Sequence, residues 1–167
     1  LHNDRKLFEF LTLDGMQSGL SWRIVLNKRP FFQKAFEKFD AKKISKFTDD
    51  DVDRLMNDKE IIRNRRKIES VINNAQKFLD TKKEFGSFDS YIWSFTDYNT
   101  MTNRFKNWDE IPSTSEESEN MSRDLKARGF TFVGPTVCYA FMQTIGMVND
   151  HVVGCFRRQE LKETGLP

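Results

Sequence analysis

Apolar residues recur every three or four positions along most of the chain, a spacing typical of amphipathic helices. The longest such stripe consists of Ile68, Val71, Ile72, Ala75, Phe78 and Leu79. We expect its helix to end at Gly86, a residue type common just after helices, and Ser87 to cap a short helix over FDSYIWSF. Another helix is predicted after Thr48, because Thr48 and Asp51 have the spacing of a capping box.

The first part of the chain is predicted to form two helices separated by glycines. The apolar face of the first helix carries Leu7, Phe8 and Leu11. Gly15 and Gly19 interrupt this pattern, and a second helix follows around Trp22. We expect the second helix to end before Arg29-Pro30, because proline disfavours helical backbone in the residue that precedes it.

Residues 97–120 are polar and rich in Asn, Thr, Ser and Glu. We expect them to form a surface excursion, since they are too short and too closely flanked by core segments to be a domain linker. The alternation of apolar and polar residues that marks strands is rare. The pattern therefore predicts an all-α fold, with residues 1–167 in a single helical domain.

Composition and charge narrow the classes of protein to consider. Hydrophobic residues make up 38% and charged residues 31% of the 167 residues, which predicts a packed fold rather than disorder. The net charge is only +2, so a polyanion would have to meet a local basic patch. No apolar run is long enough to span a bilayer and no secretory signal is visible, and two cysteines do not make a disulfide framework. We expect a reducing, intracellular compartment.

The segment LDGMQSGLSW places a carboxylate before a glycine-containing junction and an indole eight residues later. If the chain folds back here, Asp14 and Trp22 can line one pocket, in which the carboxylate accepts an amino-group hydrogen bond and the indole stacks on a flipped base. The alternative is structural, since Asp before Gly is often a turn former and a Trp in an apolar pattern usually belongs to the core. Composition alone favours this alternative.

A second candidate lies at Gly134-Pro135, where a short turn joins two apolar helices after a helix end at Gly129. Backbone N–H groups at such a turn and at the start of the next helix form a small anion site that suits a DNA phosphate. Basic residues that could add affinity are Lys126, Arg128 and the cluster at residues 63–67. The alternative is an ordinary helix–helix turn with a solvated basic face, which the spacing alone favours.

His151 and Cys155 form a third candidate. Their spacing of four places two zinc-ligand side chains on one helical face. A structural zinc site normally needs four ligands, and the remaining candidates, His2 and Cys138, lie at the chain start and within an apolar helix pattern. From the residues alone, a structural pair and a ligand pair remain equally supported.

Taken together and in order, several long blocks resemble the DNA-3-methyladenine glycosylase I family. They are LDGMQSGLSW, the segment from KFDAKKISKFTDDD to INNAQKFL, YIWSF, and SRDLKARGFTFVGPTVCYAFMQTIGMVNDHVVGC. The resemblance runs from Lys6 to Cys155. It implies an all-helical domain of the helix-hairpin-helix glycosylase superfamily that hydrolyses the N-glycosidic bond of 3-methyladenine in double-stranded alkylated DNA, releasing the base.

The resemblance also assigns roles to individual residues. Asp14 stands where the family usually has a glutamate that hydrogen-bonds the flipped base, and is therefore the candidate catalytic and base-binding carboxylate. Trp22 corresponds to the tryptophan that stacks on the base. The candidate DNA-binding residues are Gly19 and Leu20, in the loop that approaches the gap left by the flipped nucleotide, and Gly134, Thr136 and Lys126 at the phosphate-binding hairpin.

His151 and Cys155 correspond to the C-terminal half of a structural zinc site in this family. The family's N-terminal segment, which carries two further zinc ligands and aromatic pocket residues, is absent from this sequence. We interpret the sequence as a chain lacking that segment and expect no complete zinc site within it. We expect a monomer in the cytoplasm, associated with the nucleoid when acting and without a membrane partner. The rival hypotheses are a noncatalytic DNA-binding helix-hairpin-helix module and a helical metal-binding interaction protein.

Overall fold

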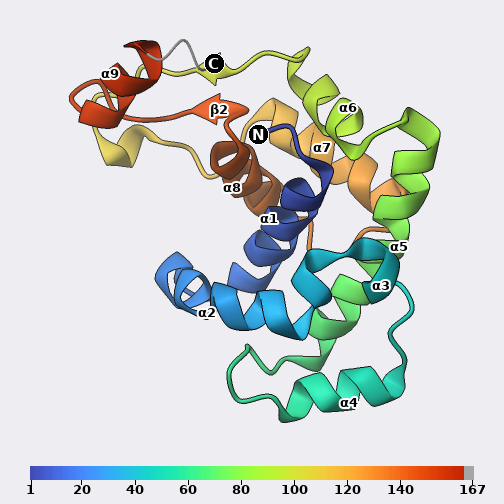
Figure 1. Ribbon diagram of the computed structural model, residues 1–167. Helices are drawn as coiled ribbons and strands as arrows, with labels where there is room; N and C mark the ends of the chain where they lie inside the picture. The colour runs from blue at the N-terminus through green and yellow to red at the C-terminus, as the bar shows by residue number, and fades with distance from the viewer. Residues whose placement is uncertain (164–167) are drawn as a thin grey trace.

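The computed structural model describes residues 1–163, with side chains to Leu161, and confirms the all-α prediction (Figure 1). The α-helices are α1 (Asp4–Gln17), α2 (Trp22–Ala35), α3 (Ala41–Ile44), α4 (Asp49–Asn57), α5 (Arg65–Phe85), α6 (Phe88–Trp93), α7 (Glu116–Ala127), α8 (Pro135–Ile145) and α9 (Phe156–Glu163). Three short 3₁₀ turns are η1 (Glu37–Phe39), η2 (Ser94–Thr96) and η3 (Trp108–Glu110). None of the helices in this part of the chain is both long and apolar enough to cross a bilayer.

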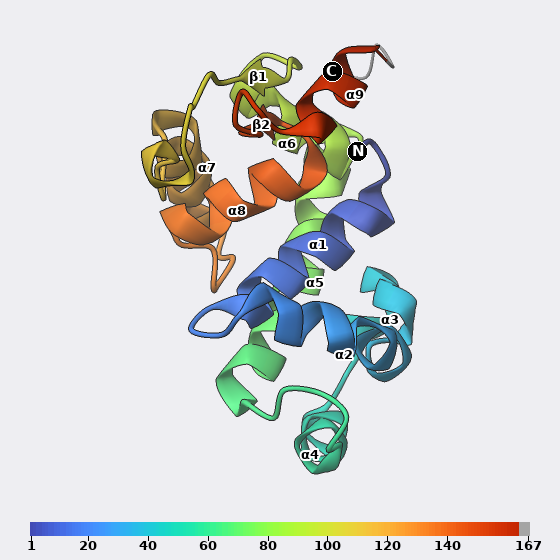
Figure 2. The ribbon, with the colours of Figure 1, turned by 90° about the vertical axis from the view of Figure 1, so that its left-hand side faces the viewer.

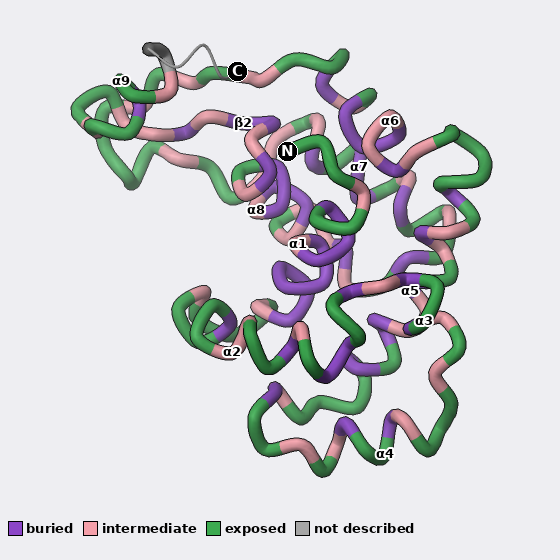
Figure 3. Tube along the Cα trace, in the orientation of Figure 1, coloured by how far each residue is buried: buried purple, intermediate pink, exposed green. Residues whose placement is uncertain are grey.

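Helix α1 runs through the middle of the molecule, where the chain is most buried (Figure 3). It packs against α2, α5, α6 and α8, which together enclose the apolar core. Aromatic contacts link the layers: the ring centroids of Phe8 and Phe78 lie 5.0 Å apart, and those of Phe78 and Phe88 lie 4.6 Å apart. Burying one such side chain is worth about 1.5–3 kcal/mol, so this cluster fixes α1 against α5 and α6.

The boundaries of α5 and its neighbours follow the sequence signals. Gly86 ends α5 with a positive φ of 82°, and the Ser87 hydroxyl accepts a hydrogen bond from the Ser90 N–H at 2.9 Å to begin α6. At α4 the predicted capping box is present, with the Asp51 carboxylate accepting from the Thr48 N–H at 3.1 Å.

Two predicted helix boundaries are wrong. Gly15 does not interrupt α1, which continues to Gln17, and Pro30 lies inside α2 rather than after it. A proline inside a helix costs about 3 kcal/mol through a lost hydrogen bond and a steric clash. Phe32 and Phe36, which follow it, are completely buried, and their burial offsets this cost.

The surface excursion predicted over residues 97–120 is shorter in the structure. Its strand β1 (Met101–Thr102) pairs in parallel with β2 (Val148–Asn149), with Met101 opposite Val148. Helix α7 begins at Glu116, because Ser115 and Ser118 cap its first turn reciprocally. Residues 116–120 therefore belong to the helical body rather than to the excursion.

Candidate active site and DNA-binding hairpin

The junction between α1 and α2 is a tight exposed loop over residues 18–21. Gly19 adopts a positive φ of 78°, a conformation that glycine reaches without steric cost, and Leu20 is 39% exposed beside it. The Ser21 hydroxyl accepts a hydrogen bond from the Ile24 N–H at 3.4 Å and caps α2. Gly19 and Leu20 thus lie in the loop between α1 and α2, which extends to the left of both helices in Figure 2.

Asp14 lies in the last turns of α1 and is only 2% exposed. Its Oδ2 atom is buried and has no hydrogen-bond partner among the described residues. Desolvation disfavours the ionised form and raises the pKa of Asp14 well above its ordinary value. A buried carboxylate without a partner is costly for the fold, and such groups concentrate at functional sites.

Asp14 is enclosed by the hairpin segment and α8. A Cβ atom added to its neighbour Gly15 would lie 3.6 Å from the Phe132 carbonyl oxygen, so α1 approaches the hairpin closely at this point. Burial raises the pKa of the Cys138 thiol in α8 to about 12, and the charge of Asp14 adds to the shift. The candidate catalytic carboxylate therefore sits between the α1–α2 junction and the hairpin.

Trp22 is the first residue of α2 and packs half-buried against the core. Asp14 precedes and Trp22 follows the same loop. A cleft of about 610 Å³ beside the hairpin is lined by neither residue.

The hairpin between α7 and α8 is anchored by polar side chains that the sequence analysis did not single out. The Asn74 amide of α5 accepts from the Thr131 N–H and donates to the Thr131 carbonyl, both at 2.8 Å. Asn73 donates to the Gly129 carbonyl at 2.8 Å, and the Ser122 hydroxyl of α7 donates to the Val133 carbonyl at 2.7 Å. A polar stripe at helical spacing beside the apolar stripe of α5 was the signal that could have revealed Asn74.

These anchors leave the tip of the hairpin with free donors. Within residues 1–163, the backbone N–H groups of Phe132, Val133 and Gly134 donate no hydrogen bond. Gly134 is the N-cap of α8, and a Cβ atom added there would meet nothing within 4 Å. Thr136 is exposed in the first turn of the same helix. Open N–H groups at a helix N-terminus are suited to binding an anion.

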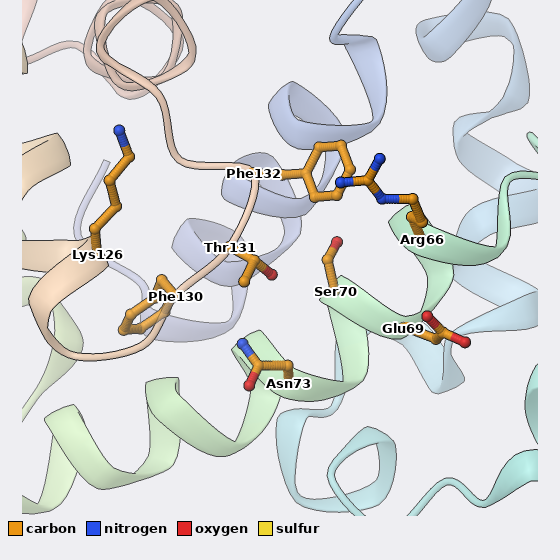
Figure 4. Close-up of a pocket in the computed structure, with 8 residues that line it drawn as sticks. All are labelled: Arg66, Glu69, Ser70, Asn73, Lys126, Phe130, Thr131 and Phe132. Atoms are coloured by element: carbon orange, nitrogen blue, oxygen red, sulfur yellow. The ribbon is translucent and has the colours of Figure 1, made fainter.

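The cleft beside the hairpin separates two basic side chains (Figure 4). Its lining consists of Arg66, Glu69, Ser70, Asn73, Lys126, Phe130, Thr131 and Phe132. Arg66 of α5 and the exposed Lys126 of α7 lie on opposite sides of the hairpin segment. Arg128, also proposed for DNA binding, instead pairs with Glu84 and Asp124, each at 2.7 Å, and is therefore committed to the fold.

His151 and Cys155 lie close together, but not on a helical face. They occupy an irregular turn between β2 and α9, and the predicted helix over them is wrong because α9 begins only at Phe156. The Cys155 Sγ lies 3.6 Å from the His151 Nδ1. A tetrahedral zinc with bond lengths of about 2.3 Å to sulfur and 2.0 Å to nitrogen holds these atoms about 3.6 Å apart, so the pair fits two ligand positions. No group of three or more His, Cys, Asp or Glu residues suited to a metal occurs in the described part of the chain.

The sequence profile of a family described as methyladenine glycosylase matches residues 1–158. The chain is 43% identical over 153 residues to DNA-3-methyladenine glycosylase 1 of Escherichia coli (strain K12), a match that covers 92% of this chain and 82% of the relative. A crystal structure of 3-methyladenine DNA glycosylase I superimposes with a TM-score of 0.91 at 42% identity, covering 93% of this chain and 86% of that one.

A structure of 3-methyladenine DNA glycosylase I from Staphylococcus aureus, solved to show how that protein recognises 3-methyladenine, also superimposes on this chain with a TM-score of 0.91. It is 30% identical and covers 93% of this chain and 83% of that one. Sequence and fold agree over nearly the whole molecule. The chain belongs to the methyladenine glycosylase family.

Proposed function

We propose that this protein is a DNA repair glycosylase that hydrolyses the N-glycosidic bond of 3-methyladenine in double-stranded alkylated DNA after flipping the base. The observation that carries the proposal is the buried, unpaired carboxylate of Asp14 beside a hairpin with open backbone donors. Family membership supports the same activity: a solved relative is described as bound to 3-methyladenine.

Asp14 selects the lesion by charge and hydrogen bonding. Methylation at N3 makes the adenine nucleoside cationic, so the base leaves readily and no strong general acid is required. A cationic base beside Asp14 lowers the pKa that burial has raised, and its amino group donates to the orphaned oxygen. Asp is one methylene shorter than the glutamate usual in the family, so the base has to approach α1 more closely.

Trp22 supplies the stacking surface for the flipped base. Stacking on an aromatic side chain is worth about 1–3 kcal/mol, which offsets the few kcal/mol that flipping costs. Water then attacks the oxocarbenium-like sugar. The hairpin segment 129–136 contains no lysine that could form a Schiff base, which supports a monofunctional hydrolase without strand cleavage.

The exposed loops hold the DNA. A phosphate binds at the open N–H groups around Gly134 and Thr136, and Lys126 adds a sequence-independent electrostatic contact. Gly19 and Leu20 approach the gap left by the flipped nucleotide, because they form the exposed tip of the loop next to Asp14 and Trp22. We propose that the protein acts as a monomer.

His151 and Cys155 supply two of four ligands to a structural zinc. Their 3.6 Å separation fits a tetrahedral ion, which would tie the β2–α9 turn to the rest of a metal site. The pair follows the C-terminal end of α8, whereas the hairpin precedes its N-terminal end, and the pair takes no part in the chemistry.

Release of free base tests the function directly. Purified protein is incubated with methylated duplex DNA, and the supernatant is assayed chromatographically for 3-methyladenine. The DNA strands should stay intact until alkali cleaves them at the abasic sites. DNA binding without base release would instead favour a noncatalytic binding module. Metal binding without DNA binding would favour a helical metal-binding interaction protein.

A further inference from the structure

The first turn of α5 carries charges of the wrong sign for a helix N-terminus. Its first three residues are Arg65, Arg66 and Lys67, and the turn contains no acidic residue. Cations at this end oppose the helix dipole and cost about 0.3–1 kcal/mol each. Arg65 is explained by its ion pair with Asp53. Lys67 requires a different explanation, since it forms no ion pair among the described residues and is only 6% exposed.

The Lys67 ammonium group binds the end of another helix. Its Nζ donates to the Met16 carbonyl at 2.8 Å and to the Ser18 carbonyl at 2.6 Å. These carbonyls belong to the C-terminus of α1, where the last turn contains no basic residue of its own. A cation at this end satisfies orphan carbonyls and complements the dipole of α1. The charge that is unfavourable for α5 is therefore favourable for α1.

This contact fixes the loop that leads to the candidate site. Ser18 directly precedes Gly19 and Leu20, and Trp22 begins α2 three residues after Gly19. Within residues 1–163, the bond from Lys67 to Ser18 is the sole hydrogen bond that joins residues 18–21 to another part of the fold. The other bonds of the loop are local, from Ser18 to Gly15, from Leu20 to Gln17 and from Ile24 to Ser21.

The same helix also holds the hairpin. Asn74 clamps Thr131 seven residues after Lys67, two helical turns along α5. At about 1.5 Å per residue, the two anchor points are separated by about 10 Å of rigid helix. Helix α5 thereby fixes both DNA-facing loops at once, with Lys67 as the anchor of the α1–α2 loop.

We propose that Lys67 is a positioning residue that sets the Gly19–Leu20 loop for base excision without touching the substrate. The proposal rests on the glycosylase function proposed above. A loop displaced by about 1 Å can lower a reaction rate about 100-fold, so loss of this anchor acts on the excision step itself.

The test compares Lys67→Met, which keeps the aliphatic stem, with Lys67→Gln, which keeps one donor group. Lys83→Met is the matched control, because Lys83 is an exposed lysine of the same helix whose side chain forms no ion pair or hydrogen bond among the described residues. Single-turnover excision is measured over a range of enzyme concentrations, well below each variant's melting temperature. Hydrogen exchange reports the amides of residues 18–22 in parallel.

We expect the saturated excision rate to fall about 10- to 100-fold in Lys67→Met and less in Lys67→Gln, with the half-saturating concentration changed by less than about threefold. Exchange at residues 18–22 should be highest in Lys67→Met and intermediate in Lys67→Gln, and Lys83→Met should match the wild type. If Lys67→Met does not fold, the excision rate and exchange of Lys67→Gln are compared with those of the wild type. If a folded Lys67 variant shows the same exchange at residues 18–22 or the same saturated excision rate as the wild type, the proposal is overturned. Failure of the wild type itself to release base refutes the glycosylase function instead, and the exchange data still test the anchor.

Discussion

At the scale of one residue, Asp14 is a candidate functional group that lowers the free energy of unfolding. Its pKa lies above the unfolded value of about 3.9, because burial disfavours the charge. Well below pH 3.9 the carboxyl is protonated in both the folded and the unfolded state, so it does not change stability. As the pH rises, the unfolded chain ionises first, and the free energy of unfolding falls until Asp14 ionises in the folded protein as well.

Replacement by asparagine should therefore stabilise the protein near neutral pH. We expect the melting temperature of Asp14→Asn to exceed that of the wild type at pH 7.5, and the difference to shrink toward pH 4. Each kcal/mol corresponds to about 2–4 °C for a chain of this size. Thermal unfolding of both proteins across this pH range measures the difference. An equal gain in melting temperature at both pH values would show that ionisation of buried Asp14 does not destabilise the fold.

Trp22 offers a second test at a single position. Loss of a stacking interaction of about 1–3 kcal/mol predicts that Trp22→Ala weakens inhibition by free 3-methyladenine about 5- to 150-fold. Trp22→Phe keeps an aromatic face and should lose less. Competition of free base with excision measures both, and inhibition that remains unchanged in the alanine variant would remove Trp22 from the base site.

Sequence reasoning singled out Asp14 and Trp22 because an acidic residue and an indole flank a glycine junction, but composition alone favoured a structural role, and the family resemblance assigned the functional one. It could not show that Asp14 lacks a partner, since that depends on which side chains α8 and the hairpin bring close. Lys67 and Asn74 were missed for a related reason. Their partners are backbone carbonyls and N–H groups of remote segments. Polar residues at helical spacing in α5 mark a polar face there, but they do not show which remote segment it contacts.

At the scale of elements, the hairpin depends on α5. The Asn74 amide replaces a pair of backbone hydrogen bonds, and its removal leaves polar groups of Thr131 unpaired at a cost of about 1–3 kcal/mol. We predict that Asn74→Ala lowers the free energy of unfolding by that amount and weakens binding of undamaged duplex DNA.

The neighbouring residue provides the control for this prediction. Asn73 makes one bond to the Gly129 carbonyl and is less buried than Asn74, so Asn73→Ala should lose less stability and less affinity. Denaturant unfolding and fluorescence anisotropy with duplex DNA distinguish the two variants. Equal effects of the two substitutions would refute the special role of the Asn74 clamp.

Element boundaries were predictable where a local signal determines them. Gly86, Ser87 and the Thr48 capping box act through their own backbone neighbours, and each lies where expected. Pro30 and Gly15 were misjudged because tertiary contacts prevail there. Buried phenylalanines carry α2 past Pro30, and the close approach of Phe132 gives Gly15 a packing role within an unbroken helix.

At the scale of the whole molecule, the described residues contain the two zinc ligands that we propose, His151 and Cys155, and no group of three or more residues that could hold a metal. Two ligands bind zinc much more weakly than four, so we predict that residues 1–167 carry less than one equivalent of zinc after dialysis. Elemental analysis of the purified protein measures the content, with Cys155→Ser as the control for binding at this pair. A stoichiometric zinc that depends on Cys155 would contradict the prediction and reveal ligands from elsewhere.

The molecule brings its functional parts together around α1. The central helix presents Asp14, its end leads into the loop of Gly19 and Leu20, and α5 fixes that loop and the hairpin on one framework. The resemblance of long sequence blocks predicted the helical glycosylase fold and singled out Asp14, the Gly19–Leu20 loop and the hairpin, but not the role of α5, and periodicity alone predicted only the helical class. The close agreement with solved glycosylases extends over the same residues.

The most direct test of the account is single-turnover release of 3-methyladenine from a duplex with one lesion, by the wild type and by Asp14→Asn. We predict that the wild type releases the free base and that the variant is slower by about 10- to 100-fold, the effect of one lost hydrogen bond to a charged group. Affinity for undamaged duplex should stay within about twofold, since the hairpin is untouched. Equal rates for the two proteins, or no release by the wild type, would contradict the central claim.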